Sequence, residues 1–210
     1  MAKSSATTRS SVPSPALYQD WDDATLWQCF RGGDRGAFEQ ILESHYALLL
    51  NYGIRISSDR EFVKDCLHDL FVDFWNQRER LKEVRNLKSY LLVSFRRKLL
   101  RESKRMRWFR EAGEVSDDYA FEVQFTIEAY LINNEIQHES LVKLKTSLEK
   151  LTKRQREVIY LRFYQEMDYE EIADSLEINY HSVVNLMYEG MKLLRKNWFF
   201  GFLATCTFYP

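Results

Sequence analysis

The stretch LTKRQREVIYLRFYQEMDYEEIADSLEINYHSVVNLMYEGMKLLRK, residues 151–196, decides the fold class of the C-terminal part of this chain. Two pairs of residues in it have the spacing of a capping box. In that motif, the residue that starts a helix and the residue three positions later each bind the other's backbone N–H. Thr152 with Gln155 predicts one helix, and Asp168 with Glu171 predicts a second helix over YEEIADSL.

A third helix, YHSVVNLMYEGMKLLRK, is predicted to begin after the capping residue Asn179. Apolar or small residues recur at helical spacing on the second and third helices, at Ile172, Ala173, Leu176, Val183, Leu186, Met187, Gly190, Met191 and Leu194. Only three residues, 177–179, separate the two helices, which is the tight connection of a helix-turn-helix. Such a pair can be a plain packing unit. In a DNA-binding one, the last helix lies in the major groove.

The charge of the chain is unevenly distributed. The 210 residues carry a net charge of −1, so the whole protein is not a general binder of polyanions. The segment 78–110 nevertheless holds thirteen basic residues against three acidic ones, whereas 114–140 holds seven acidic residues and no Lys or Arg. This pattern predicts a local site for a polyanion, followed by an acidic connector.

Nearly the whole chain is predicted to be helical, because Pro occurs only at positions 13, 15 and 210. Asp23 is expected to cap a short helix, and Asp34 to cap a longer one that Gly53 stops. Ser58 with Glu61 predicts an amphipathic helix that runs to about residue 78. Asn86 is expected to cap a long basic helix, LKSYLLVSFRRKLLRESKRMRW.

The expected fold class is therefore all-α, with two small helical domains joined by a flexible acidic linker. The predicted division is a disordered tail 1–19, a helical domain 20–108, the linker 109–140, a helix-turn-helix domain 141–198 and an apolar tail 199–210. That apolar tail is too short to span a bilayer, so we expect it to dock on its own domain or on a partner, with membrane contact as the lesser alternative. No signal peptide is visible, and the three cysteines (29, 66 and 206) are typical of reduced thiols in a cytosolic protein.

The residue patterns of the two central helices indicate different functions. The helix from residue 58 has an acidic polar face, which should avoid DNA and either dock a protein or remain solvated. The basic helix combines cations with the aromatic residues Tyr90, Trp108 and Phe109. Cations neutralise phosphates, and aromatic rings stack on unpaired bases, so this helix is suited to hold separated strands.

Three segments resemble the bacterial sigma-70 family, and their order and the short linker resemble its extracytoplasmic-function (ECF) group. They are DCLHDLFVDFW (Asp65–Trp75), NLKSYLLVSFRRKLLRESKR (Asn86–Arg105) and LTKRQREVIYLRFYQEMDYEEIADSLEIN (Leu151–Asn179). The resemblance covers about residues 22–108 and 143–197. It implies a cytoplasmic bacterial transcription initiation factor, not an enzyme, that binds core RNA polymerase through its clamp and flap. It also implies promoter DNA as a partner, duplex at the −35 element and melted at −10, and an anti-sigma factor, which is often membrane-bound in the family. No cofactor, metal or small-molecule substrate is expected.

The resemblance also implies roles for individual residues. The core-polymerase contacts would be Asp65, His68, Asp69, Phe71, Asp73, Trp75 and Asn76. The −10 contacts would be Lys82, Arg85, Asn86, Lys88, Arg96, Arg97, Arg101 and Lys104. The −35 contacts would be Tyr180, His181, Ser182, Val184, Asn185, Tyr188 and Lys192, with Arg154 and Arg156 on phosphates. The acidic linker would run through the polymerase, partly along the template or RNA path.

The chain departs from the family pattern at three places. His68 stands where a Gln is usual, and Glu177 stands where the turn usually has Gly; a non-Gly residue with positive φ costs about 1 kcal/mol. The third helix lacks the several cations that the family places there. Asn185 can still pair with adenine, and Val184 can contact a thymine methyl group. Because this helix has few cations for phosphates, the sequence predicts weak binding to the −35 element that depends on the polymerase.

Two other classes of protein compete with this interpretation. A helix-turn-helix regulator that binds duplex DNA without polymerase would leave the acidic helix and the basic segment without a task. A metal-dependent phosphohydrolase would use the His68–Asp69 doublet, with His45 as a further ligand, but no other ligand spacing in the sequence converges on that doublet.

Overall fold

The computed structural model describes residues 18, 21–110, 121 and 146–197, and these residues form helices with no strand among them. The elements are α1 (Asp23–Arg31), α2 (Arg35–Ile56), α3 (Arg60–Gln77), the short 3-10 helix η2 (Arg78–Arg80), α4 (Leu87–Arg110), α6 (Lys153–Phe163), α7 (Tyr169–Leu176) and α8 (Tyr180–Asn197). The all-α prediction is confirmed for this part of the chain. The predicted tail 1–19, apart from Tyr18, most of the acidic linker and the apolar tail 199–210 lie outside the described residues, as do the side chains of Trp108 and Phe109.

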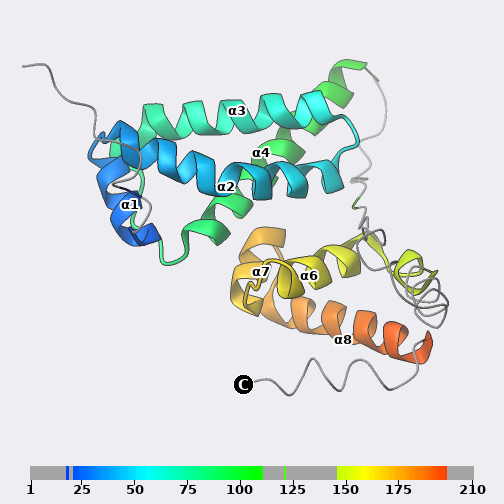
Figure 1. Ribbon diagram of the computed structural model, residues 1–210. Coiled ribbons are helices and arrows are strands. Elements are labelled where there is room, and N and C mark those ends of the chain that lie inside the picture. The colour runs from blue at the N-terminus through cyan, green and yellow to red at the C-terminus, as the bar shows by residue number, and fades with distance from the viewer. Residues whose placement is uncertain (1–17, 19–20, 111–120, 122–145, 198–210) are drawn as a thin grey trace, which may run out of the picture.

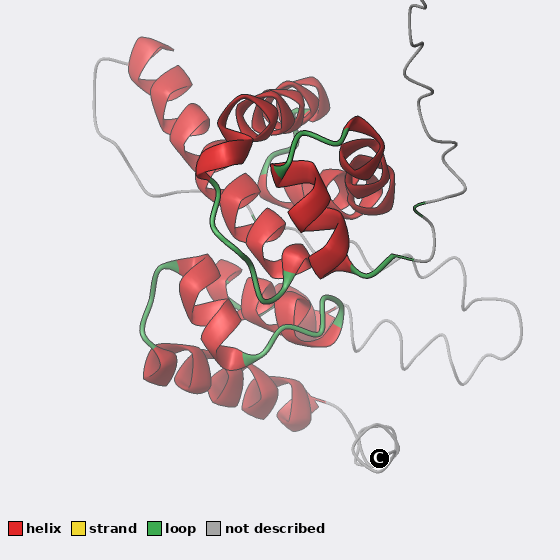
Figure 2. Ribbon diagram, turned by 90° about the vertical axis from the view of Figure 1, so that its left-hand side faces the viewer, coloured by secondary structure: helices red, strands yellow, loops and turns green. Residues whose placement is uncertain are grey.

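The helices form two groups that contact each other. In Figure 1, α2 and α3 lie side by side, α4 crosses behind them, and α1 packs at one end. The helices α6, α7 and α8 form a second group below, and Figure 2 shows the same separation from another side. Contacts between α4 and α7 join the groups. Glu157 of α6 also binds Tyr52 of α2 and Arg96 of α4, which lie 105 and 61 positions away in sequence.

Side-chain caps fix where the helices of the C-terminal group begin. Both capping boxes predicted for this C-terminal group are complete, with Thr152 and Asp168 accepting from the backbone N–H three residues later. Asn179 caps α8 by accepting from the backbone N–H of Ser182 at 2.8 Å. Asn86 caps α4 in the same way. The sequence predictions for these four helix starts are therefore confirmed.

Two predicted caps are wrong by one residue, and the predicted helix stop is also wrong. Asp22 rather than Asp23 caps α1, and Asp59 rather than Ser58 caps α3, because each is the carboxylate that reaches the free N–H groups of the first turn. Gly53 does not end α2, which continues to Ile56. A Cβ at Gly53 would lie 2.6 Å from Val63 Cγ1 and 2.7 Å from Phe95 Cε1. This glycine therefore allows α2 to approach α3 and α4 closely.

The core of the N-terminal group contains apolar side chains from both α3 and α4. On α4, the fully buried side chains are Leu87, Leu91, Leu92, Phe95 and Leu99. The indole Nε1 of Trp27 donates to the carbonyl of Lys82 at 2.9 Å, which fixes the loop that leads into α4. Within the described residues, no helix is both long and apolar enough to cross a membrane.

Candidate functional site

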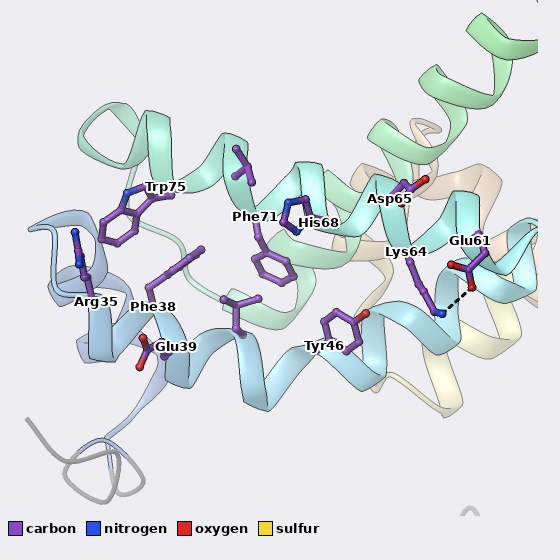
Figure 3. A pocket seen from close by; sticks show the side chains of 12 residues that line it. Arg35, Phe38, Glu39, Tyr46, Glu61, Lys64, Asp65, His68, Phe71 and Trp75 are labelled. Atoms are coloured by element: carbon purple, nitrogen blue, oxygen red, sulfur yellow. Dashed lines mark hydrogen bonds and ion pairs between the residues drawn. The ribbon is translucent and has the colours of Figure 1, made fainter. Parts of the chain in front are cut away.

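A groove runs between α2 and α3 on the outer face of the N-terminal group (Figure 3). The side chains that line it come from both helices: Arg35, Phe38, Glu39, Leu42 and Tyr46 from α2, and Glu61, Lys64, Asp65, His68, Phe71, Val72 and Trp75 from α3. Aromatic contacts hold its wall in place, since Phe38 lies 5.2 Å from the ring of Trp75 and stacks on Phe30. The groove therefore combines a rigid apolar wall with charged residues at its edges.

Two large apolar side chains in this groove are open to solvent. Val72 is 43% exposed and Tyr46 is 39% exposed. Asp65 and His68 are exposed beside them, whereas Lys64 is paired with Glu61 at 2.7 Å. Burying the exposed apolar area against another protein would be favourable, and the exposed carboxylate of Asp65 suits a basic partner.

The structure places some of the predicted polymerase-binding residues in this groove, and others elsewhere. Asp65, His68, Phe71 and Trp75 line it, although Phe71 is buried. Asp69 and Asn76 are exposed but do not line the groove. The carboxylate of Asp73 instead accepts from Lys98 of α4 at 2.6 Å, so this side chain is turned toward α4.

The contribution of α2 to the groove was missed in the sequence analysis. Phe38, Leu42 and Tyr46 follow each other at a spacing of four residues, which places them on one face of a helix. That spacing could have indicated a second apolar stripe on α2. It could not have shown that the stripe faces the acidic helix.

The residues predicted to bind −10 DNA fall into two sets. Those that are at least partly accessible lie in the loop before α4, along it and toward its end: Lys82, Arg85, Asn86, Lys88, Arg97, Arg101 and Lys104. Arg96 is different, because it is only 5% exposed and donates to Glu157 of α6. In this conformation α6 covers Arg96, so its role as a −10 contact stays a prediction. Sequence spacing gave no sign of a contact between residues 61 positions apart.

The outward face of α8 is open. Tyr180 and Tyr188 are 47% and 62% exposed, and His181, Asn185 and Lys192 are also exposed, whereas Ser182 and Val184 are half-buried. Tyr188 lies within reach of Lys192, whose Nζ is 5.9 Å from the ring centre. On α6, Arg154 is exposed and Arg156 is half-buried.

The turn between α7 and α8 has a left-handed residue at the position where the family usually has glycine. Glu177 has φ 55° and ψ 43°, a left-handed conformation that usually favours glycine. A second residue of this kind, Glu166 with φ 57°, follows α6 and was not predicted. Each of these turns ends one helix abruptly and sets the direction of the helix that follows.

Burial and hydrogen bonding shift the pKa of several ionisable groups in the N-terminal helical group. Burial raises the pKa of the Cys66 thiol to about 11. Burial and the hydrogen bond to Asp34 raise the pKa of Tyr18, and the hydrogen bond from Thr25 lowers the pKa of the Asp22 carboxyl.

Metal-ligating side chains do not converge in the part of the chain that the structure describes. Within residues 21–110 and 146–197, no group of three or more His, Cys, Asp or Glu side chains is placed to hold a metal ion. His45 is buried, with its Nδ1 3.0 Å from the carbonyl of Ile41 in its own helix. The described residues thus give the phosphohydrolase hypothesis no ligand set.

Comparisons with known proteins agree with the helix-turn-helix and with the overall fold. The family model for "Sigma-70, region 4" matches residues 141–194. The ECF RNA polymerase sigma factor SigX of Bacillus subtilis (strain 168) is 23% identical over 166 residues, which are 76% of this chain and 82% of SigX. The RNA polymerase sigma factor YlaC of the same organism is 23% identical over 169 residues, which are 78% of this chain and 92% of YlaC.

A solved structure shares the fold. The sigma factor RpoE from Bartonella quintana, solved in complex with the anti-sigma factor NepR, superposes with a TM-score of 0.52 at 18% identity. The match covers 76% of this chain and 95% of that one. The structure contains the predicted helix-turn-helix with its open outward face, and the relatives match three quarters of the chain. On these grounds, residues 141–194 are a sigma-70 region 4 domain, and the chain is similar to sigma factors over about three quarters of its length, among them one of the ECF group.

Proposed function

We propose that this transcription initiation factor docks on core RNA polymerase through the groove between α2 and α3. In this proposal, the loop before α4 and α4 itself hold the melted −10 element, and α8 reads the −35 element. The protein acts in the cytoplasm, where polymerase and promoter DNA are found. The observation that carries the proposal is the open groove, which combines exposed apolar residues with the exposed acidic residue Asp65.

The groove supports binding to polymerase rather than to DNA. Carboxylates repel phosphates, so the side of α3 that carries Asp65 and Asp69 is unsuited to DNA. An exposed apolar patch rimmed by charge is typical of a protein interface. A regulator that binds DNA alone would have no use for this surface.

The loop between η2 and α4 supports contact with DNA at −10. Lys82 and Arg85 are exposed, and the bond from Trp27 to the Lys82 carbonyl holds the loop in one position. A pre-ordered loop loses less conformational entropy when it binds. Cations there would neutralise phosphates, and bases displaced from the stack could be held against the loop.

The outward face of α8 supports contact with DNA at −35. Asn185 is exposed in the middle of this face and has the geometry to bind adenine through two hydrogen bonds. Lys192 and Arg154 are accessible for phosphates. The small number of cations on α8 supports a −35 contact that is weak without polymerase.

An anti-sigma factor is proposed as a further partner. RpoE from Bartonella quintana, which shares this fold, is bound by an anti-sigma factor in its solved structure. The exposed apolar residues of the groove, Val72 and Tyr46, would suit such a partner as well as polymerase. The two would then compete for one surface.

The proposal is tested by gel filtration with bacterial core RNA polymerase. The unchanged chain is expected to co-elute with the polymerase at micromolar concentration, and the double variant Asp65→Lys/Asp69→Lys is expected to elute alone. The matched control is Asp23→Lys/Glu149→Lys, which makes the same change of charge at two exposed residues outside α3. It should still co-elute.

Two results would contradict the proposal in different ways. Co-elution of the Asp65→Lys/Asp69→Lys variant would move the docking surface away from α3. Separate elution of the unchanged chain would favour the DNA-binding regulator that does not use polymerase, and a search for its operator would follow.

A further inference from the structure

An acidic residue lies on the outward face of α8, where a helix that contacts DNA usually carries cations. The residue is Glu189, and its side chain is 55% exposed. It follows Asn185 by four positions, about one turn of a helix, so the two side chains lie on the same face. In Figure 1, α8 is the helix of the C-terminal group that lies farthest from the N-terminal group, and Figure 2 shows the same arrangement.

The opposite side of α8 fixes the orientation of Glu189. Val183 and Met187 are buried on that side, and Gly190 packs closely against α6. The helix cannot turn about its axis without exposing these residues to water. Glu189 therefore stays beside Asn185 in any DNA complex that keeps the packing of α8 on α6.

The neighbouring cation does not satisfy this carboxylate. Nζ of Lys192 lies 3.9 Å from Oε1 of Glu189, which is within the range of an ion pair but too long for a hydrogen bond. Both side chains are more than half exposed, and exposed pairs of this kind contribute little to stability. When Lys192 turns toward a phosphate, Glu189 needs a hydrogen-bond donor from the DNA itself.

A carboxylate in the major groove restricts the base that it can face. Phosphates repel it, and removing it from water without a hydrogen-bond donor is costly. Guanine presents only the acceptors O6 and N7 there, and thymine presents the acceptor O4 and a methyl group. Adenine presents the amino group N6 beside the acceptor N7, whereas cytosine presents the amino group N4 with no acceptor of its own beside it. Cytosine is therefore the base that Glu189 can bind best.

We propose that Glu189 is a specificity-determining residue that accepts a hydrogen bond from N4 of a cytosine in the −35 duplex. The proposal rests on the proposed function, in which the outward face of α8 reads the −35 element, and it adds a second base reader to Asn185. Side chains one helical turn apart are separated by about 5–6 Å, and stacked bases by about 3.4 Å. The cytosine therefore lies one or two base pairs from the adenine that Asn185 binds. Guanine or thymine in its place is disfavoured by repulsion, which adds to the specificity.

The proposal is tested with the full chain assembled on core RNA polymerase. The DNA is a library of duplexes with a random −35 region, joined to a −10 region that mismatches keep open, so that no particular −10 sequence is needed. Bound DNA is recovered and sequenced. The unchanged chain is expected to enrich cytosine at one position, one or two base pairs from an enriched adenine. Glu189→Ala is expected to lower the cytosine preference about fivefold and to keep the adenine, since about fivefold is the lower end of what a good base contact contributes.

Two control variants separate base reading from other effects of the charge. Glu149→Ala removes an exposed carboxylate that precedes α6, and it should keep both preferences. Lys192→Ala should weaken binding to all sequences and keep the cytosine preference. If Lys192→Ala loses that preference as fully as Glu189→Ala, then Glu189 only positions Lys192, and the proposal is overturned. Circular dichroism checks that each variant retains its helical content.

A modified base tests the hydrogen bond on the unchanged chain as well. In a duplex, N4-methylcytosine still pairs with guanine, but its methyl group replaces the N4–H that points into the major groove. This base at the selected position should weaken binding of the unchanged chain about fivefold and leave binding of Glu189→Ala unaffected. 5-Methylcytosine keeps that N–H and adds a methyl group nearby, so it is the control for crowding and should weaken binding less. An equal loss in both proteins with N4-methylcytosine would overturn the proposal.

The outcomes separate this proposal from the proposed function. A −35 preference that is the same in the unchanged chain and in Glu189→Ala would refute the role of Glu189 and retain α8 as the reader of the −35 element. No enrichment at any position of the random region, in a complex that still contains polymerase, would refute α8 as that reader, and the role of Glu189 with it.

Discussion

Arg97 of α4 and Glu177 of the helix-turn-helix turn form an ion pair, with 2.9 Å between Nε and Oε1, although the backbone of Glu177 has a left-handed φ of 55°. The sequence raised the question of why a glutamate occupies a position that glycine would fill without strain. The structure offers a reason, because a glycine there could not bind Arg97. The turn that orients α8 is thereby tied to the basic helix of the other group.

The first prediction is that Glu177→Gly leaves the free energy of unfolding nearly unchanged. The glycine relieves a left-handed strain of about 1 kcal/mol, and the loss of a half-exposed ion pair removes about 0.2–1 kcal/mol. Glu177→Gln is the control, since it keeps the strain and loses the charge, and it should be the less stable of the two variants. Urea unfolding followed by circular dichroism measures both. A Glu177→Gly protein that is much less stable than Glu177→Gln would contradict this account of the turn.

The second prediction distinguishes base reading from phosphate binding on α8. Asn185→Ala should relax the preference among −35 sequences, because a good two-bond contact to a base contributes about 1–3 kcal/mol of discrimination. Lys192→Ala should weaken binding to all sequences alike and reduce the salt dependence by about one phosphate contact. Competition binding with a set of −35 duplexes at several salt concentrations, with polymerase present, measures both effects. An unchanged sequence preference for Asn185→Ala would remove this residue as a base reader.

The third prediction compares two buried glycines. At Gly53, an added methyl group would lie 2.6 Å from Val63 Cγ1, and the nearby ring of Phe95 has no room to move away. Gly53→Ala should therefore lower stability by about 1–3 kcal/mol, in spite of the better helix propensity of alanine. At Gly190, the nearest atom is the flexible end of Ile159 at 3.1 Å, so Gly190→Ala should be neutral or slightly stabilising. Thermal unfolding of the two variants gives the comparison, and similar stabilities would contradict it.

Local signals were sufficient to predict the helices. Capping side chains such as Thr152, Asp168 and Asn179 act within three residues, so they can be recognised in the sequence. Asp59 was missed in favour of Ser58 because both residues can cap and they are adjacent. Gly53 was misread as a stop because glycine both ends helices and allows them to pack closely.

Contacts between distant segments could not be predicted in this way. The groove needs α2 beside α3, and the burial of Arg96 needs α6 against α4. Neither contact leaves a periodic pattern in the sequence, because an arginine that binds DNA and an arginine that binds a buried glutamate are the same residue type on the same helix. The resemblance to the sigma-70 family implied roles for these residues, but not which of them another helix covers in the structure.

The last prediction concerns Cys66 on α3. Its thiol is buried, and burial raises its pKa to about 11, so at pH 8 only about one thiol in a thousand is the reactive thiolate. The sign follows from desolvation, which disfavours the charged form, and reactivity should increase as the pH rises toward that pKa. Iodoacetamide at pH 8, followed by mass spectrometry of the peptides, should therefore leave Cys66 unmodified in the folded protein. The same thiol should react fully in urea, where it is hydrated. Rapid modification of Cys66 without denaturant would mean that α3 separates from α4 in solution, and it would contradict the packing on which the groove depends.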